Sequence, residues 1–313
     1  MALKRYDLIE GEIDKVQIAI DRLRAFEPPE GYYVAFSGGK DRQCIYHLCE
    51  MAGVKFDAHY RVTSVDPPEL VQFIKRQYPQ VSMDIPHDKD GKPITMWNLI
   101  PRKGLPPTRI ARYCCEVLKE SGGDGRLTVT GVRWAESANR KRTQAMVSIK
   151  SGRGKADTVA KIATDNGADY TANGRGGIGL NMDNTESRRT VEQCYRTRKT
   201  LVNPIIDWEE EDVWEFLNEV AKVPHCELYD QGRTRLGCIG CPMNESGAAA
   251  DLDAYPKYKR HYIRAFDKML AAKHAKGIEM RWLNGEDVMK WWVGGGIRSQ
   301  GVDGQLDMWE DDE

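Results

Sequence analysis

The sequence predicts an α/β fold, a doubly wound parallel sheet with a helical C-terminal portion. Short apolar runs at residues 32–36, 55–62 and 127–132 are typical of buried strands, and helical patterns separate them. Strands that alternate with helices favour a parallel sheet with right-handed crossovers. A glycine-rich loop directly follows the first run, at the carboxyl end of a strand, where such sheets bind their ligands.

The elements follow from local patterns. Apolar residues at helical spacing over 6–25 predict that the N-terminal segment, residues 1–28, is a helix. Pro67 and Pro68 suit the first turn of a helix that runs to residue 78. The other expected elements are a helix at 42–52, a strand at 81–85, and helices at 212–220, 255–275 and 287–293.

The expected domain organisation has one main domain with appendages. The main α/β domain spans 29–243, a helical region spans 244–302, and an acidic tail spans 303–313. Residues 151–189 are rich in Gly, Asn, Asp and Thr, which predicts a flexible insertion near the site. Disorder of this segment in the free protein is the alternative.

Composition excludes several classes of protein. Hydrophobic content of 41% and charged content of 30% are typical of a soluble globular protein. The apolar runs fall short of the ~20 residues of a membrane span, and the N-terminus lacks a secretory pattern, so we expect a cytoplasmic location without membrane partners. Eight cysteines are too few for a disulfide scaffold in 313 residues, which makes clustered cysteines candidates for metal or catalytic chemistry.

The glycine-rich loop has the properties of a phosphate cradle. Its residues, Ser37-Gly38-Gly39-Lys40-Asp41, lie between an apolar strand and a helix. Glycine permits positive φ and close backbone approach, and the N–H groups at a helix start face an anion. The common P-loop has a four-residue spacer that is missing here. An ordinary glycine-rich turn is the alternative.

The loop resembles the PP-loop of the adenine nucleotide α-hydrolases, whose members cleave ATP between the α and β phosphates. Their usual last residue is Ser, where this chain has Arg42. The resemblance implies a site for ATP with Mg²⁺ in a Rossmann-like fold. In it Lys40 contacts phosphate, Asp41 orients the loop or the metal, and Arg42 supplies a phosphate contact. The implied nucleotide-binding residues are Ser37, Gly38, Gly39, Lys40, Asp41 and Arg42.

Further segments resemble the phosphoadenylyl sulfate reductase family over about residues 32–243. Residues 131–137 match its Gly-x-Arg-x-x-Glu-Ser pattern, and residues 203–208 with 212–214 match its Asn-Pro-Ile segment. Thr63 and residues 66–69 occupy the place of its second substrate-facing loop. The resemblance implies catalytic roles for Arg133 and Glu136 beside Lys40 and Asp41, and a nucleotide contact by Arg140.

The cysteine pairs Cys114-Cys115 and Cys238-x-x-Cys241 resemble the [4Fe-4S] site of assimilatory adenylyl sulfate reductases. Thiolates suit iron–sulfur or zinc, so a Cys₄ zinc site and unligated cysteines remain as alternatives. Nearby cations would offset thiolate charge. These flanking cations are Arg112 and Lys119, and the cysteines expected to be unligated are Cys44, Cys49, Cys194 and Cys226.

Two features separate this chain from the reductases of that family. Those enzymes use a C-terminal nucleophilic cysteine, but no cysteine follows Cys241, and their PP-loops tend to be degenerate whereas this one is nearly complete. Both favour an ATP pyrophosphatase-like member that resembles the iron–sulfur component of DNA phosphorothioation systems. The implied activity is adenylylation of an acceptor with pyrophosphate release, preparing sulfur transfer to DNA or another nucleic acid.

Alternatives to that activity stay open. One is a sulfonucleotide reductase with an external thiol donor, and the other is a non-catalytic nucleotide- or DNA-binding module. Seven basic residues against one acid between Arg133 and Lys155 suit a triphosphate, a sulfonucleotide phosphate or a nucleic-acid backbone. A solvated helix face is the rival interpretation. The expected partners are therefore an adenine nucleotide, a nucleic acid, and a sulfur or electron donor protein.

Overall fold

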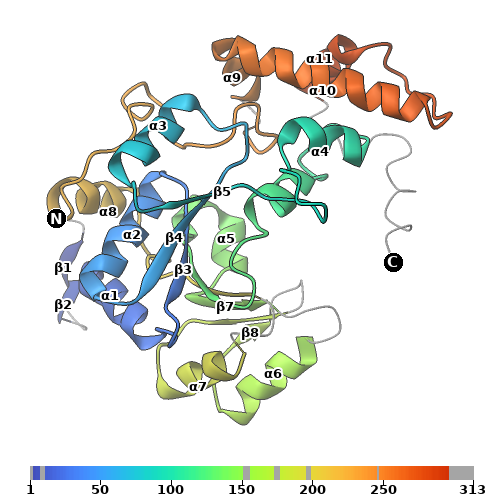
Figure 1. Cartoon of the computed structure of the whole chain (residues 1–313). Coiled ribbons are helices and arrows are strands. Elements are labelled where there is room, and N and C mark those ends of the chain that lie inside the picture. The colour runs from blue at the N-terminus through green and yellow to red at the C-terminus, as the bar shows by residue number, and fades with distance from the viewer. Residues whose placement is uncertain are drawn as a thin grey trace. The chain divides into compact units, whose positions relative to one another are not determined.

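The computed structural model describes residues 3–7, 11–150, 156–172, 177–194, 199–244 and 247–295. Within these ranges the chain forms two compact units, each assembled from three separate segments (Figure 1). The first unit contains Met1–Tyr60, Glu69–Met83 and Gly122–Leu236. The second unit contains Arg61–Pro68, Asp84–Ser121 and Gly237–Glu313. This division differs from the expected boundary at 243, because residues 61–68 and 84–121 group with the C-terminal helices.

An eight-stranded sheet forms the framework, with strand order β5-β4-β3-β6-β10-β7-β9-β8. Strands β4, β3, β6 and β10 pair in parallel, which confirms the predicted α/β fold, while β7, β9 and β8 add an antiparallel edge. The strands are β3 (Tyr32–Phe36), β4 (Phe56–Arg61), β5 (Ser82–Asp84), β6 (Leu127–Val129), β7 (Val147–Lys150), β8 (Thr171–Ala172), β9 (Gly177–Leu180) and β10 (Lys199–Val202).

Helices flank the sheet. Helices α1 and α2 pack on each other, and α2 also packs against β3 (Figure 1). The helices and short helical turns of this part are α1 (Lys15–Ala25), α2 (Lys40–Ala52), α3 (Pro68–Gln77), η2 (Trp134–Glu136), α5 (Ala138–Thr143), α6 (Ala156–Asp165), α7 (Thr185–Cys194), α8 (Glu210–Glu215) and η3 (Phe216–Val220).

The N-terminal segment differs from the expected helix over 1–28. Strands β1 (Lys4–Asp7) and β2 (Gly11–Asp14) form an antiparallel pair before α1 begins at Lys15. Gly11 has φ of 78°, and the Asp14 side chain accepts hydrogen bonds from the N–H groups of Val16 and Gln17. Asp14 is therefore an N-cap, and N-caps start helices rather than lie inside them.

The predicted flexible insertion at 151–189 contains regular structure in its described residues, which include α6, β8, β9 and the first half of α7. Ile178 and Leu180 of β9 are fully buried, and α6 packs against this strand. A Cβ atom at Gly179 would lie 2.7 Å from the Ala145 side chain, so glycine serves close packing here rather than mobility. Residues 151–155 and 173–176 lie outside the described residues.

The second unit is mainly helical, as predicted for the C-terminal portion. Its core gathers Ile100, Phe266 and Trp292, each with no exposed surface, and Trp292 Nε1 donates to the carbonyl oxygen of Pro107 at 2.7 Å. Its helices are α4 (Met96–Lys103), the π-helix η1 (Cys115–Lys119), α9 (Ala248–Ala254), α10 (Pro256–His274) and α11 (Gly285–Val293). The predicted tail at 303–313 lies outside the described residues.

Candidate functional site

The glycine loop connects β3 to α2 in the first unit. Gly38 has φ of 67°, and a Cβ atom there would lie 2.7 Å from the Ile74 side chain, so glycine is required on both counts. Gly39 is the N-cap of α2 and, as a glycine, supplies no side-chain cap. The Lys40 N–H donates to the Tyr229 hydroxyl at 2.9 Å and the Arg42 N–H donates to the Gly39 carbonyl oxygen at 2.9 Å, so an anion at this helix start would compete with Tyr229 for the Lys40 N–H.

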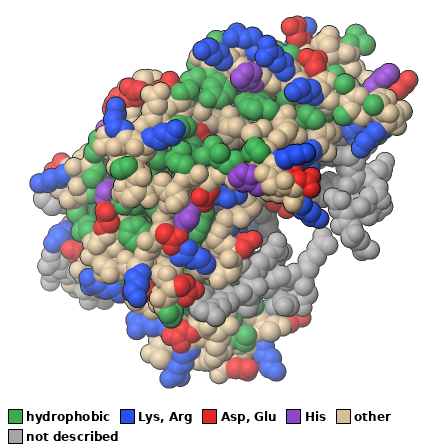
Figure 2. Space-filling view, in the orientation of Figure 1, with side chains coloured by type: hydrophobic (Ala, Val, Ile, Leu, Met, Phe, Trp, Pro, Cys, Tyr) green, Lys and Arg blue, Asp and Glu red, His purple; other side chains and the backbone are tan. Residues whose placement is uncertain are grey.

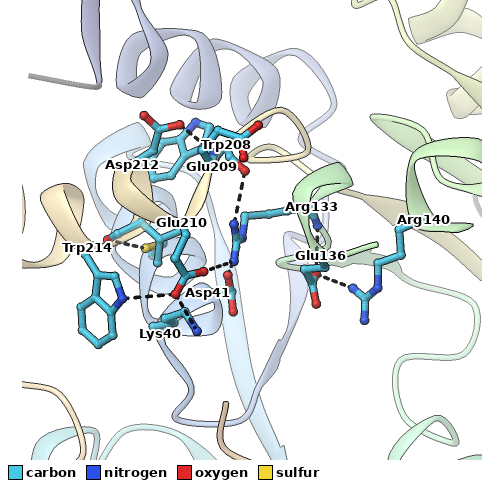
Figure 3. Close-up of polar contacts among 12 residues, drawn as sticks. Lys40, Asp41, Arg133, Glu136, Arg140, Trp208, Glu209, Glu210, Asp212 and Trp214 are labelled. Atoms are coloured by element: carbon cyan, nitrogen blue, oxygen red, sulfur yellow. Dashed lines mark hydrogen bonds and ion pairs between the residues drawn. The ribbon is translucent and has the colours of Figure 1, made fainter. Parts of the chain in front are cut away.

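Lys40 is held by several partners in this structure (Figure 3). Its side chain is 6% exposed, and Nζ donates to the carbonyl oxygen of Thr234 at 2.6 Å and pairs with Glu210 Oε1 at 3.1 Å. The Tyr229 and Trp214 rings lie 5.3 and 6.0 Å from Nζ, within the range of cation–π attraction. The ammonium group is thus already compensated before any ligand binds.

Arg133 is also engaged. Its Nε donates to Asp41 Oδ1 at 2.6 Å, and Nη2 donates to Glu210 Oε2 at 2.8 Å. Burial acts to lower the pKa of Arg133, but the carboxylates of Asp41 and Glu210 outweigh it and raise the pKa. A Cβ atom at Gly131 would lie 2.8 Å from the Asp41 carbonyl oxygen. The segment after β6 therefore fixes the start of α2 by close packing and by charge.

Glu210 was missed by sequence reasoning although it links Lys40 to Arg133 (Figure 3). Burial acts to raise the pKa of Glu210, but Lys40 and Arg133 outweigh burial and lower it. The signal was present in the run Glu209-Glu210-Glu211 after Trp208. Only the fold reveals which of these three acids faces the loop.

Glu136 and Arg140 form a second pair near Arg133. Glu136 Oε1 accepts the Arg133 backbone N–H at 3.1 Å and the Arg140 Nη1–H at 2.5 Å. Ser137 caps α5 by accepting the Arg140 N–H at 3.2 Å. The structure thus brings the four predicted catalytic residues, Lys40, Asp41, Arg133 and Glu136, together in the first unit. Arg133 contacts the loop through Asp41, and Glu136 holds both Arg133 and Arg140.

Arg42 differs from the other cations. Its Nη1 atom is buried and has no hydrogen-bond partner among the described residues. Burial is the main cause that lowers the pKa of Arg42, and the charges of Arg140 and Arg235 act in the same direction, while Asp41 and Glu136 oppose them. A buried donor without a partner is costly, so a ligand anion would satisfy it. This is the position where the resemblance places Ser.

The four candidate metal-binding cysteines all belong to the second unit. Cys114 precedes the π-helix η1, Cys115 begins it, and Cys238 and Cys241 lie in one turn, where the Cys241 N–H donates to the Cys238 carbonyl oxygen at 3.2 Å. All four are half-buried, whereas the other four cysteines are fully buried. Segments more than a hundred residues apart in sequence therefore supply thiols to the same unit.

The thiols influence one another and nearby cations. A hydrogen bond from Cys114, aided by Arg112 and Lys119, lowers the pKa of Cys115 against the opposing effect of burial. The negative charge of Cys238, followed by smaller effects of Asp66 and Cys241, raises the pKa of Lys119. Burial raises the pKa of Cys238 to about 12. Thr63 Oγ1 lies 3.6 Å from Cys238 Sγ, so the predicted second loop borders the thiols.

The donor set fits a thiolate-bound metal centre, because four cysteines are accompanied by the cations Arg112 and Lys119, which would offset their charge. In the described part of the chain, no group of three or more His, Cys, Asp and Glu side chains is arranged to hold one metal ion. A Cys₄ zinc ion needs four sulfurs at about 2.3 Å from the metal. The four thiols affect one another electrostatically, but they have no preformed geometry for a single metal ion.

The basic run from Arg133 to Lys155 is less available than the sequence indicated. Arg133 is buried, Arg140 is paired with Glu136, and residues 151–155 lie outside the described residues. Lys141, Arg142 and Lys150 remain exposed. Figure 2 shows basic and acidic side chains interspersed over the visible face rather than gathered by sign. No helix in the described ranges is long and apolar enough to cross a membrane.

Parts of the chain are similar in sequence to known proteins. Residues 31–244 match the phosphoadenosine phosphosulfate reductase domain. An uncharacterized protein of Methanocaldococcus jannaschii is 23% identical over 248 residues, which are 75% of this chain and 40% of that protein. The adenosine 5'-phosphosulfate reductase of Oceanobacillus iheyensis is 31% identical over 74 residues, 23% of this chain and 30% of that protein. The adenosine 5'-phosphosulfate reductase of Shouchella clausii is 33% identical over 66 residues, which are 20% of this chain and 27% of that protein.

The matched parts thus span at most 40% of the length of these relatives. Among solved structures, the FMN adenylyltransferase of Candida glabrata in complex with ATP overlaps 72% of this chain and 60% of that chain, with a TM-score of 0.37 and 16% identity. That likeness is too low to support an argument about the site. The matched domain covers the glycine loop, the Arg133 segment and both cysteine pairs, and the chain belongs to the phosphoadenosine phosphosulfate reductase domain family.

Proposed function

We propose that the protein is an ATP-binding enzyme that adenylylates an acceptor and releases pyrophosphate. The observation that carries the proposal is the buried Nη1 of Arg42 in the first turn of α2, which has no hydrogen-bond partner among the described residues. The charged side chains that interact with one another around the loop include five cations and three carboxylates. These are Lys40, Arg42, Arg133, Arg140 and Arg235 against Asp41, Glu136 and Glu210.

The residues of the first unit would act by binding and orientation. The N-terminus of α2 and Arg42 would hold the phosphates, while Arg133 keeps Asp41 in place. Mg²⁺ is usually held by one or two carboxylates together with substrate phosphates, and Asp41 would supply such a carboxylate. An acceptor oxygen would form a bond to the α-phosphorus, the bond to the α,β-bridging oxygen would break, and pyrophosphate would leave with that electron pair.

The second unit would hold a [4Fe-4S] cluster through Cys114, Cys115, Cys238 and Cys241. Such a cluster supplies electron transfer or sulfur relay when bound. Lys119 and Arg112 would offset the negative charge of the thiolates. The adenylylated acceptor, a nucleic acid in this proposal, would then be open to displacement by sulfur from a donor protein. Reduced thiols of this kind suit a cytoplasmic location.

A sulfonucleotide reductase is the second candidate. Two relatives carry the name adenosine 5'-phosphosulfate reductase, and a buried arginine suits a sulfate as well as a phosphate group. An external thiol would then be required as reductant. A nucleotide- or DNA-binding module without turnover is the third candidate.

One anaerobic assay separates the three candidates. Purified protein is incubated with ATP, Mg²⁺ and candidate acceptors, and pyrophosphate and AMP are measured. Pyrophosphate release that requires Arg42 supports the proposal. Sulfite release from a sulfonucleotide with a thiol donor, without ATP turnover, would replace it by the reductase. Nucleotide binding with neither product would leave the binding module.

A further inference from the structure

Three donors converge on the carboxylate of Glu210 (Figure 3). Glu210 Oε1 receives Lys40 Nζ at 3.1 Å and Trp214 Nε1 at 3.2 Å. Glu210 Oε2 receives Arg133 Nη2 at 2.8 Å. Two cations and a neutral N–H donor around one oxyanion are the arrangement by which proteins hold phosphate or sulfate.

Exposure differs sharply within this group. The Glu210 side chain is 53% exposed, whereas those of Lys40 and Arg133 are 6% and 4% exposed. The remaining partners of the two cations are the carbonyl oxygens of Thr234 and Trp208 and the carboxylate of Asp41. An anion that approaches Lys40 and Arg133 from solvent therefore competes with Glu210.

Exchange of one anion for another is the least costly change at this point. If Glu210 turned outward alone, two buried cations would lose a compensating charge, which is strongly unfavourable. If a ligand anion enters as Glu210 leaves, both cations stay paired. The carboxylate itself regains water because half of its side chain is already exposed.

We propose that Glu210 occupies the place of a ligand phosphate between Lys40 and Arg133, and that it selects for multiply charged polyphosphates by requiring its own displacement. This inference rests on the proposed nucleotide site. A single tetrahedral anion such as sulfate gains little by replacing a carboxylate, because it brings no second anionic group for Arg42. Pyrophosphate or a triphosphate carries enough charge to replace Glu210 and still contact Arg42.

The test compares Glu210→Gln with Glu211→Gln, which removes the same charge from the exposed neighbouring position. Titration calorimetry with inorganic pyrophosphate and with sulfate measures both affinities. Glu210→Gln should bind pyrophosphate at least about tenfold more tightly than the wild type, as expected for about 1.4 kcal/mol of relieved competition. The ratio of pyrophosphate affinity to sulfate affinity should be smaller in this variant than in the wild type. Glu211→Gln should resemble the wild type. Unchanged or weaker binding by Glu210→Gln would overturn the proposal.

A second measurement uses the wild-type side chain. Trp214 Nε1 loses its acceptor when Glu210 leaves, so pyrophosphate should change the tryptophan fluorescence, and Trp214→Phe should remove that change. A change that persists in Trp214→Phe would contradict displacement. Pyrophosphate release from ATP tests the proposed function separately. If Glu210→Gln binds pyrophosphate more tightly but the protein does not turn over ATP, the proposed function is overturned and the displacement of Glu210 stands. If ATP is turned over but Glu210→Gln does not bind pyrophosphate more tightly, the displacement of Glu210 is overturned and the proposed function stands.

Discussion

The two units present opposite kinds of site. Around the glycine loop of the first unit, cations and carboxylates pair with one another, through Lys40, Glu210, Arg133 and Asp41. In the second unit, four half-buried thiols gather, and each negative charge among them disfavours the next. The first site is compensated from within, whereas the second would need a neutralising partner to hold several thiolates together.

The two sites therefore differ in how much their folded structure depends on a bound ligand. Ion pairs and close glycine packing hold the loop in shape without a nucleotide, as at Gly131 against Asp41. A metal centre bound by deprotonated thiols contributes binding free energy to folding, because the unfolded chain has no preformed site. Loss of ligand should therefore matter more for the fold of the second unit than for that of the first.

The largest expected effect is at the thiols. Replacing Cys238 or Cys241 by Ser should abolish bound iron and acid-labile sulfide in anaerobically purified protein. It should also lower stability by about 3 kcal/mol or more, because a cross-link between remote segments is lost. Cys194→Ser is the control, since Cys194 lies in the first unit. Metal analysis and thermal unfolding measure both effects. Stoichiometric zinc without sulfide would show that the centre is not an iron–sulfur cluster.

An intermediate effect is expected at Arg42. Arg42→Ser restores the side chain usual in PP-loops and should weaken ATP binding about tenfold to a hundredfold, since a charge-assisted hydrogen bond contributes about 1.5–3 kcal/mol. Arg142→Ser, at an exposed position on α5, is the matched control and should bind ATP normally. Calorimetry with ATP and Mg²⁺ measures the change. Equal losses in both variants would mean that general positive charge, rather than Arg42, governs binding.

A smaller effect concerns pH. Because the pKa of Glu210 is lowered below its usual 4.5, its ionised form stabilises the folded state above that value, and this contribution is lost as pH falls through the lowered pKa. The wild type should therefore be more stable than Glu210→Gln at neutral pH, and the difference should shrink below pH 4.5. Chemical denaturation across this range measures it. A difference independent of pH would assign the effect to packing.

The smallest effect is expected for nucleic acid. Reversing Lys141 and Arg142 to Glu should flatten the salt dependence of DNA binding, at about 0.9 in log–log slope for each lost phosphate contact. ATP binding should remain intact. Gel shifts at two salt concentrations measure the slope, with Lys257 and Lys259 on α10 as control positions. DNA binding that is unaffected by the reversal would exclude this basic run as the acceptor site.

Local patterns were sufficient for the strands and helices around the loop. The apolar run 32–36 and the glycines after it specify β3 and the start of α2 through burial and backbone freedom alone. Residues 177–180 were misread, because glycines that pack closely inside a strand look like loop residues in sequence. The role of Glu210 was unpredictable for another reason. The three adjacent glutamates 209–211 are chemically identical, and only the direction of each side chain at the start of α8 decides that Glu210 reaches Lys40.

The division of the chain into interleaved segments sets an order for biogenesis. Translation delivers the last segment of the first unit, ending at Leu236, before the final segment of the second unit begins at Gly237. Cys114 and Cys115 therefore leave the ribosome many seconds before Cys238 and Cys241, given synthesis at about 5–20 residues per second. During that interval the first pair has no partners from the second. Insertion of a cluster bound by all four thiols would be a late event, which follows completion of the nucleotide-binding part of the chain.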